Sequence, residues 1–393
     1  MSSVANPQRL IVLLAALVAF APLSIDMYLP SLPLIAADLQ AAESSIQLTI
    51  SAFLIGLFIG MLFYGPLSDK FGRRGLLLGG IGLYLIASIG CMLADSAEWL
   101  IAARFMQALG GAAASVLARA IVRDLFPLNE AARVLSLMHL VTMIATLVAP
   151  LVGGYLMLIT GWRSLFMVLF AFAALMLMLS LWKIPETHHG DSRKASILAV
   201  FKAYLQIGMQ PVAIGYILCM GLTFAGMFAY ITASPFVYIE YFGVSPQHYA
   251  WFFSLNIGGV IVLVSLNARY VGRFGTQRLL IAGAALAAAS GLLLVFAGIT
   301  GSGGLALIVA GLLGFVSVTG VLGANCMASL LGRYPQQAGA AAGLAVACQF
   351  GLGALASSMT SALHDGSPLP MTLIIGLCGA GSLLALVLTR RSD

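Results

Sequence analysis

Long apolar stretches, separated by short polar or charged segments, run along nearly the whole chain. A bilayer core about 30 Å thick needs roughly 20 apolar residues in a helix that crosses it. Twelve stretches of that length cover residues 10–36, 47–67, 75–94, 98–119, 134–157, 163–183, 207–233, 249–268, 278–298, 304–327, 338–361 and 369–389. None alternates with the period of two typical of barrel strands. The pattern predicts an all-α membrane protein with twelve transmembrane helices.

Composition agrees with this prediction. Hydrophobic residues make up 61% of the chain and charged residues 8%, whereas a soluble domain has about 25% charged residues. So little charge excludes a soluble protein, a disordered chain and a nucleic-acid-binding protein. The cysteines lie in apolar stretches without CxxC spacing, so we expect packing residues and neither disulfides nor metal ligands: Cys91, Cys219, Cys326, Cys348 and Cys378.

The positive charges predict the orientation. If the amino terminus is cytoplasmic, all 19 Lys and Arg residues except Arg104 and Arg163 fall on the cytoplasmic side. The opposite connections instead carry acids, such as Glu43 and Asp95. Because cytoplasmic loops of membrane proteins carry an excess of Lys and Arg, both termini are predicted to be cytoplasmic.

The longest polar break, near residues 185–202, divides the stretches six and six. The sequence therefore predicts an amino-terminal bundle (1–184), a cytoplasmic linker (185–205) and a carboxyl-terminal bundle (206–393). His188 and His189 in this break are adjacent, but they lack the nearby Cys or carboxylate groups of a metal site, and we expect no metal.

The two halves repeat a short pattern. Phe71-Gly72 recurs as Phe274-Gly275, after the second stretch of each half. Parallel repeats of this kind place a substrate site between the halves, near the middle of the membrane.

Four motifs point to one family. Residues 65–74 (Gly-Pro-Leu-Ser-Asp-Lys-Phe-Gly-Arg-Arg) resemble the G-x-L-a-D-x-x-G-R-[KR] signature of the major facilitator superfamily. Residues 104–107 are similar to the R-x-x-Q-G motif of proton-driven members, and residues 149–154 to the G-P-x-x-G-G antiporter motif, with Ala108 and Ala149 in place of glycines. Residues 22–33 resemble the bicyclomycin/chloramphenicol-resistance (Bcr/CflA) branch of the twelve-span drug:proton antiporters.

The resemblance implies two pseudo-symmetric six-helix bundles that rock around a central site. It implies export of small, largely apolar drugs of bicyclomycin, sulfonamide or phenicol type across the bacterial inner membrane, in exchange for protons. We expect a monomer in the lipid bilayer that is not an enzyme, binds no nucleic acid and needs no cofactor, because the proton gradient drives it. A metabolite exporter or symporter of the same fold is the alternative, and an intramembrane enzyme or receptor is the rival from another class.

Asp26 is the only one of the 13 acidic residues well inside an apolar stretch. Inserting an aspartate at a helix centre costs about 2.5–3.5 kcal/mol, so its presence indicates a function. Burial disfavours a charged carboxyl, and Asp26 is therefore a candidate proton-coupling and substrate-binding residue. When ionised it can attract a cationic drug or pair with Arg104, the second candidate proton-coupling residue. The structural alternatives are a polar helix contact for Asp26 and an arginine that extends back to the membrane interface for Arg104.

The resemblance also implies a conformational gate in the loop after the second stretch. Asp69 would face a helix amino terminus, that of the eleventh span, and Arg73 would reach an acid such as Asp124. The expected gate residues are Gly65, Asp69, Gly72, Arg73 and Asp124, and the expected antiporter-motif residues are Pro150, Gly153 and Gly154. A simpler role for the basic residues is orientation by positive charge.

Other polar groups inside the stretches are candidates for ligand contact or for helix packing. The remaining candidate substrate contacts are Met27, Tyr28, Gln107, Asn256, Asn325 and Gln349. His139 is a weaker candidate for a proton relay. Stripes of small residues over 52–60 and 339–351 predict either a moving contact between the halves or static packing.

Overall fold

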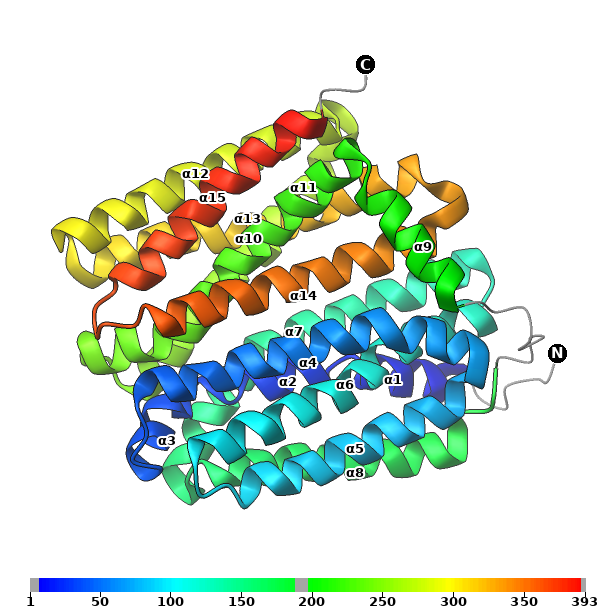
Figure 1. Cartoon of the computed structure of the whole chain (residues 1–393), viewed down its shortest axis with the longest axis horizontal. Helices are drawn as coiled ribbons and strands as arrows, with labels where there is room; N and C mark the ends of the chain where they lie inside the picture. The colour runs from blue at the N-terminus through cyan, green and yellow to red at the C-terminus, as the bar shows by residue number, and fades with distance from the viewer. Residues whose placement is uncertain (1–6, 188–196, 390–393) are drawn as a thin grey trace.

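The computed structural model describes residues 7–187 and 197–389, in which every regular element is a helix (Figure 1). The first half contains α1 (Pro7–Leu17), α2 (Phe20–Asp26), η1 (Leu29–Ser31), α3 (Leu32–Asp38), α4 (Glu43–Phe71), α5 (Arg73–Met92), α6 (Ala97–Leu125), α7 (Leu128–Thr160) and α8 (Arg163–Lys183). The second half contains α9 (Ile197–Gly208), α10 (Pro211–Pro235), η2 (Phe236–Tyr241), α11 (Pro246–Phe274), α12 (Thr276–Thr300), α13 (Gly304–Arg333), η3 (Pro335–Gln337), α14 (Ala338–Ala362) and α15 (Leu369–Thr389). The predicted all-α membrane fold is confirmed.

Twelve helical segments in the described part of the chain are long and apolar enough to cross a membrane, as predicted. Two predicted boundaries run past the observed helices. Residues 93–94, expected to end the third span, lie beyond α5, which ends at Met92. Residues 207–208, expected to open the seventh span, end the short helix α9, and the span begins at Pro211. Proline explains this start, because its ring suits the first turn of a helix and cannot continue an earlier one.

The first span is broken into α1, α2, η1 and α3. A proline inside a helix removes one hydrogen bond and clashes with the carbonyl group four residues earlier. Pro22 acts in this way on Val18, next to the break between α1 and α2, and Pro30 acts on Asp26, the last residue of α2. The proline spacing therefore leaves Asp26 at a helix end inside the membrane.

The helices form two bundles. In the first, α4 and α5 both pack on α6, and α5 also packs on α8; in the second, α10 and α12 both pack on α15, and α12 also packs on α13. The start of α1 and the end of α15 lie at the same end of the molecule, which we call the termini end; we call the other the opposite end (Figure 1). Helix α9 connects the bundles at the termini end (Figure 1).

The repeat between the halves is visible in the backbone. Gly72 separates α4 from α5 with φ 94° and ψ 158°, and Gly275 separates α11 from α12 with φ 79° and ψ 154°. Positive φ at both positions favours glycine, which has no Cβ to clash. The repeated Phe-Gly pair thus encodes the same sharp helix break twice.

The bundles meet along a seam formed by α4 with α14 and by α7 with α11. Toward the opposite end, the Ser51 hydroxyl lies 2.7 Å from the Ser357 hydroxyl, and the Ser254 hydroxyl donates to the Leu147 carbonyl group. The bundles converge at the opposite end and spread apart toward the termini end (Figure 1). We describe this conformation as closed at the opposite end.

The two small-residue stripes behave differently. A Cβ at Gly56 would lie 2.5 Å from the Phe105 carbonyl oxygen of α6, so at this residue the stripe packs within the first bundle. A Cβ at Gly351 would lie 3.2 Å from the Phe58 ring, across the seam. Gly351 on α14 therefore contacts the other bundle, whereas Gly56 on α4 contacts its own bundle. A contact that moves between the bundles is compatible with the position of Gly351 and not with that of Gly56.

Candidate functional site

Asp26 lies between the two bundles and is 4% exposed. Its hydrogen-bond partner is Thr146 of α7, and its charge acts on the phenols of Tyr230 on α10 and Tyr249 on α11. The carboxyl group is therefore in contact with the first bundle and in electrostatic reach of the second. The charge of this carboxyl group therefore acts on groups of both bundles.

Aromatic and polar side chains of the second bundle form a wall near Asp26. Asn256 donates a hydrogen bond from Nδ2 to the Tyr230 hydroxyl at 3.0 Å, and the Ser234 and Tyr249 hydroxyls lie 3.0 Å apart. The rings of Tyr238 and Tyr249 pack edge to face, with centroids 5.8 Å apart. We call these five residues the aromatic wall.

Two atoms of the aromatic wall are buried without a hydrogen-bond partner among the described residues: Asn256 Oδ1 and the Tyr238 hydroxyl. An unpaired buried polar atom costs about 1–3 kcal/mol. Native proteins satisfy nearly all such atoms with protein, water or ligand. The wall therefore offers an acceptor and a hydroxyl to a bound molecule. Asn256, a predicted substrate contact, is part of this wall near Asp26.

Arg104 lies in the core of the first bundle and is 0% exposed, which excludes an arginine that extends to the membrane interface. Its guanidinium group donates to Gln107 Oε1 at 2.6 Å and to the Ser24 carbonyl oxygen at 2.9 Å. It also lies 4.2 Å from the centre of the Phe53 ring and 4.6 Å from that of Tyr28, as in a cation–π contact.

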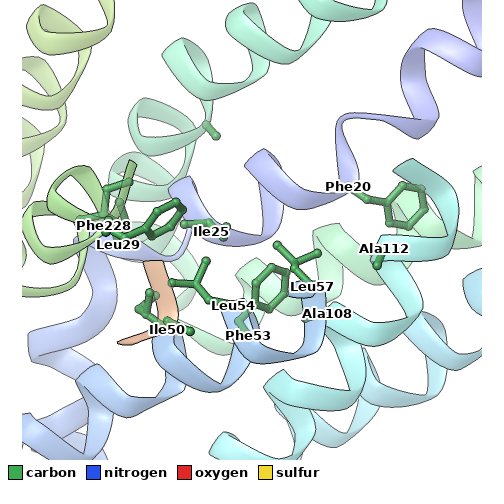
Figure 2. Close-up of a cluster of buried hydrophobic side chains, with 14 of the residues drawn as sticks. Phe20, Ile25, Leu29, Ile50, Phe53, Leu54, Leu57, Ala108, Ala112 and Phe228 are labelled. Atoms are coloured by element: carbon green, nitrogen blue, oxygen red, sulfur yellow. The ribbon is translucent and has the colours of Figure 1, made fainter. Parts of the chain in front are cut away.

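The predicted direct pair of Arg104 with Asp26 is not formed: no ion pair joins them in the part of the chain that the structure describes. Arg104 instead holds the backbone at Ser24, two residues before Asp26. Figure 2 shows Ile25, Phe53 and Leu57, apolar side chains of the buried core that also contains these polar contacts. Arg104 positions the helix that carries Asp26.

The other predicted contact residues lie apart from Asp26 or in packed surroundings. Gln107 uses its amide on Arg104 and on Ser88, and Asn325 is paired with Asn267 through both amide groups. The Tyr28 hydroxyl lies 3.0 Å from Thr49 Oγ1. Met27 is buried, Gln349 is half-buried on α14, and His139 is exposed on α7. His188 and His189 lie outside the described residues.

The predicted gate is built around Arg73. Its guanidinium group contacts Asp69 Oδ1 at 2.6 Å and Asp124 Oδ2 at 3.1 Å, which confirms the ion pair predicted between Arg73 and Asp124. The same group donates to the Ser68 hydroxyl. Gly65 has open space around its α-carbon. These contacts tie the α4–α5 turn to the end of α6.

Glu186 is a contact of the α4–α5 turn that the sequence reasoning missed. Its carboxylate accepts hydrogen bonds from the backbone N–H groups of Arg73 at 2.8 Å and Arg74 at 3.1 Å, at the start of α5. A Cβ at Gly72 would lie 2.7 Å from Glu186 Oε2, so glycine is needed there for this approach as well as for its positive φ. A carboxylate stabilises a helix amino terminus in this way.

The predicted contact of Asp69 with the eleventh span is absent from the described residues, where no hydrogen bond or ion pair joins it to residues 335–340. Asp69 instead acts electrostatically on Tyr204 of α9, and burial together with this negative charge raises the pKa of the Tyr204 phenol. The bundles spread apart at this end (Figure 1). Contact of Asp69 with the eleventh span therefore remains a prediction for a conformation that is closed at the termini end.

The antiporter motif lies against the broken first span. A Cβ at Gly153 would overlap the Met27 carbonyl oxygen and lie 2.8 Å from the carbonyl carbon. A Cβ at Gly154 would meet nothing closer than the Pro246 carbonyl oxygen, at 3.5 Å. Pro150 lies inside α7, one turn before Gly153 and one turn after Thr146. Gly153 thus lets α7 touch the backbone next to Asp26.

Glu186→Gln should weaken the amino-terminal cap of α5. The amide keeps the size of the side chain but removes its charge, so we expect a loss of about 0.3–1 kcal/mol of stability, seen as a lower melting temperature in detergent. Glu240→Gln, at an exposed site, is the control and should leave the melting temperature unchanged. Equal melting temperatures for all three proteins would show that the cap has no net effect.

Two bundles of six spans, with a buried carboxylate between them and charged gate contacts at one end, define a membrane transporter. The chain belongs to the Major Facilitator Superfamily, whose family model matches residues 14–358. The family predicted from the motifs is confirmed, and the protein is a transporter and not an enzyme.

Relatives support the same branch of the family. The chain is 34% identical to the bicyclomycin resistance protein homolog of Haemophilus influenzae, over 93% of this chain and 92% of the relative. It is 32% identical to the multidrug resistance protein MdtL of Escherichia coli, over 73% of this chain and 72% of the relative. The crystal structure of a D-xylose–proton symporter is similar in fold, with a TM-score of 0.75, 20% identity and 97% of each chain covered.

Proposed function

We propose that this protein is a proton-coupled antiporter that exports small, largely apolar drugs across the bacterial inner membrane by alternating access. The observation that carries the proposal is the position of Asp26, buried between the bundles beside Thr146 and near Tyr230 and Tyr249. The names of the resistance proteins to which the chain is similar support the drug class. In this proposal the bundles are the two domains and the termini end is cytoplasmic.

The proposed cycle begins in the conformation described here, which is closed at the opposite end. A drug enters from the cytoplasm or the inner leaflet and binds between Asp26 and the aromatic wall, where Asn256 Oδ1 and the Tyr238 hydroxyl are unpaired among the described residues. After the bundles rock, a proton from outside binds Asp26 and favours release of the drug. The proton must favour one conformation over the other, because equal binding to both would shift nothing.

The return step carries the proton inward. A membrane potential contributes about 2.3 kcal/mol per charge per 100 mV to this movement. The protein itself would need no cofactor, since the gradient supplies the free energy. A monomer would be sufficient, because one chain contains both bundles. In the outward-facing state, Asp69 and Arg73 would close the termini end.

Expression in a strain that lacks its own drug pumps tests this function. We expect lower accumulation of sulfonamides, phenicols or bicyclomycin than in cells with an empty vector, and loss of the difference when a protonophore is added. The Asp26→Asn variant at equal membrane level is the control for expression. Export of these compounds that persists with the protonophore would refute proton coupling, whereas no export of any of them would favour a metabolite exporter or symporter.

A further inference from the structure

A histidine joins the two bundles at the opposite end of the seam. His364 lies in the turn between α14 and α15 and is bound by two residues of α4, in the other bundle. Its Nε2 atom is 2.9 Å from Glu43 Oε2, and its Nδ1 atom is 3.2 Å from Gln47 Nε2. The side chains of His364 and Glu43 are 16% and 38% exposed, so solvent reaches the pair.

Gln47 lies on the other side of the imidazole from Glu43, with its amide nitrogen facing Nδ1. Gln47 is 0% exposed, and its Oε1 atom has no hydrogen-bond partner among the described residues. Rotation of this amide by 180° exchanges its oxygen and nitrogen, a change to which ordinary hydrogen-bond assignment is insensitive. In the rotated form, Nδ1–H of an imidazolium would donate to Gln47 Oε1 while Nε2–H donates to Glu43, and the amide NH2 group would take the place of the unpaired oxygen.

The other groups around His364 do not replace these partners. The Phe236 ring of η2 packs against the imidazole, with centroids 6.0 Å apart. The neighbouring Asp365 carboxylate accepts from the Ser367 backbone N–H and hydroxyl groups, and these hydrogen bonds hold its pKa below the usual range. Glu240, the charged residue of η2, is exposed and forms no ion pair with His364 within the described residues.

We propose that His364, Glu43 and Gln47 form a second proton-binding site, which takes protons from the compartment at the opposite end and holds that end closed. The contacts join different bundles, so they break when the seam opens there. Histidine changes charge between about pH 5 and 8. Protonation adds a charge-assisted bond to Glu43 that only the closed conformation contains. Acid at the opposite end therefore shifts the protein toward the conformation described here.

The direction of the effect follows from linkage. In the proposal, closure gives the protonated histidine a carboxylate partner that the open state lacks. Its contribution to closure is full at low pH and is lost as the pH rises. Ser51 and Ser357 also link the bundles, with their hydroxyls 2.7 Å apart, and these groups do not titrate. The histidine site therefore adjusts a seam that uncharged contacts also hold.

Distance measurements between spin labels on the full chain test the proposal. Cysteines at Asp95 and Ser302, in turns of different bundles at the opposite end, would carry the labels after alanine replaces the five native cysteines. All proteins would also carry Asp26→Asn, which removes the other proposed proton site and makes the result independent of the proposed function. Double electron–electron resonance in nanodiscs between pH 8.0 and 5.5 then gives the ratio of closed to open protein.

We expect this ratio to rise about two- to fivefold as the pH falls, the range for a partly exposed ion pair. His364→Gln keeps a polar side chain that cannot titrate and should abolish the rise. Glu43→Gln leaves the histidine in place but removes its carboxylate partner, and it should reduce the rise. The double variant should behave like His364→Gln. The proposal is wrong if the ratio does not change with pH, or if it changes equally with and without His364.

Discussion

Asp26→Asn should abolish drug-stimulated proton release from proteoliposomes. Asparagine has the shape of aspartate and can still hydrogen-bond Thr146, but it cannot bind and release a proton. Because Asp26 is buried between bundles and the replacement is uncharged, we expect a melting temperature close to that of the unmodified protein. The measurement is the pH change reported by a dye when drug is added to liposomes that contain equal amounts of folded protein.

Thr146→Val is the matched control for this result. It removes the hydroxyl that contacts Asp26 but keeps the carboxyl group. We therefore expect coupled transport to continue in Thr146→Val, with an altered pH profile. If Asp26→Asn transported drug against proton flux as well as the unmodified protein does, Asp26 would have no part in coupling.

Features that depend on local sequence could be predicted well. The number of spans follows from apolar length alone, and the break at Asp26 follows from Pro30, four residues later. The gate turn needs a glycine with positive φ, and Phe-Gly repeats at Gly275 for the same reason. In each case one stretch of chain contains both the cause and its effect.

Contacts between distant segments could not be predicted in the same way. Arg104 seemed the natural partner of Asp26 because opposite charges in a membrane attract, but its side chain turns to Ser24 and to aromatic rings. Glu186 follows the sixth span, and nothing in its neighbourhood indicates that it caps α5. Packing of whole bundles decides such pairs, and a single sequence does not encode that packing in any local pattern.

The aromatic wall illustrates the same limit. Tyr230, Tyr238 and Tyr249 lie on three elements that fold against one another, and in the sequence they look like ordinary interface aromatics. Of the five residues of the aromatic wall, the sequence predicts only Asn256 as a substrate contact, because an amide inside an apolar stretch is unusual. Its hydrogen bond to Tyr230 then explains why the polar atoms gather near Asp26.

Gly153→Ala should damage both stability and transport. The new methyl group would overlap the Met27 carbonyl oxygen, which belongs to rigid backbone and cannot rotate away. Overpacking of this kind costs about 1–3 kcal/mol, and alanine regains at most about 1 kcal/mol through its better helix propensity. We expect a lower melting temperature in detergent and weaker coupled transport, because α7 carries Thr146 away from Asp26 when it moves off Met27.

Gly154→Ala separates this clash from a general effect of alanine in α7. Both glycines are buried in the same helix turn and gain the same helix propensity, but the methyl group at Gly154 meets its nearest neighbour at an ordinary contact distance of 3.5 Å. We expect Gly154→Ala to match or exceed the stability of the unmodified protein and to transport normally. If both variants lost transport equally, the requirement would be for flexible backbone in α7, and close contact with the Asp26 segment would not explain the motif.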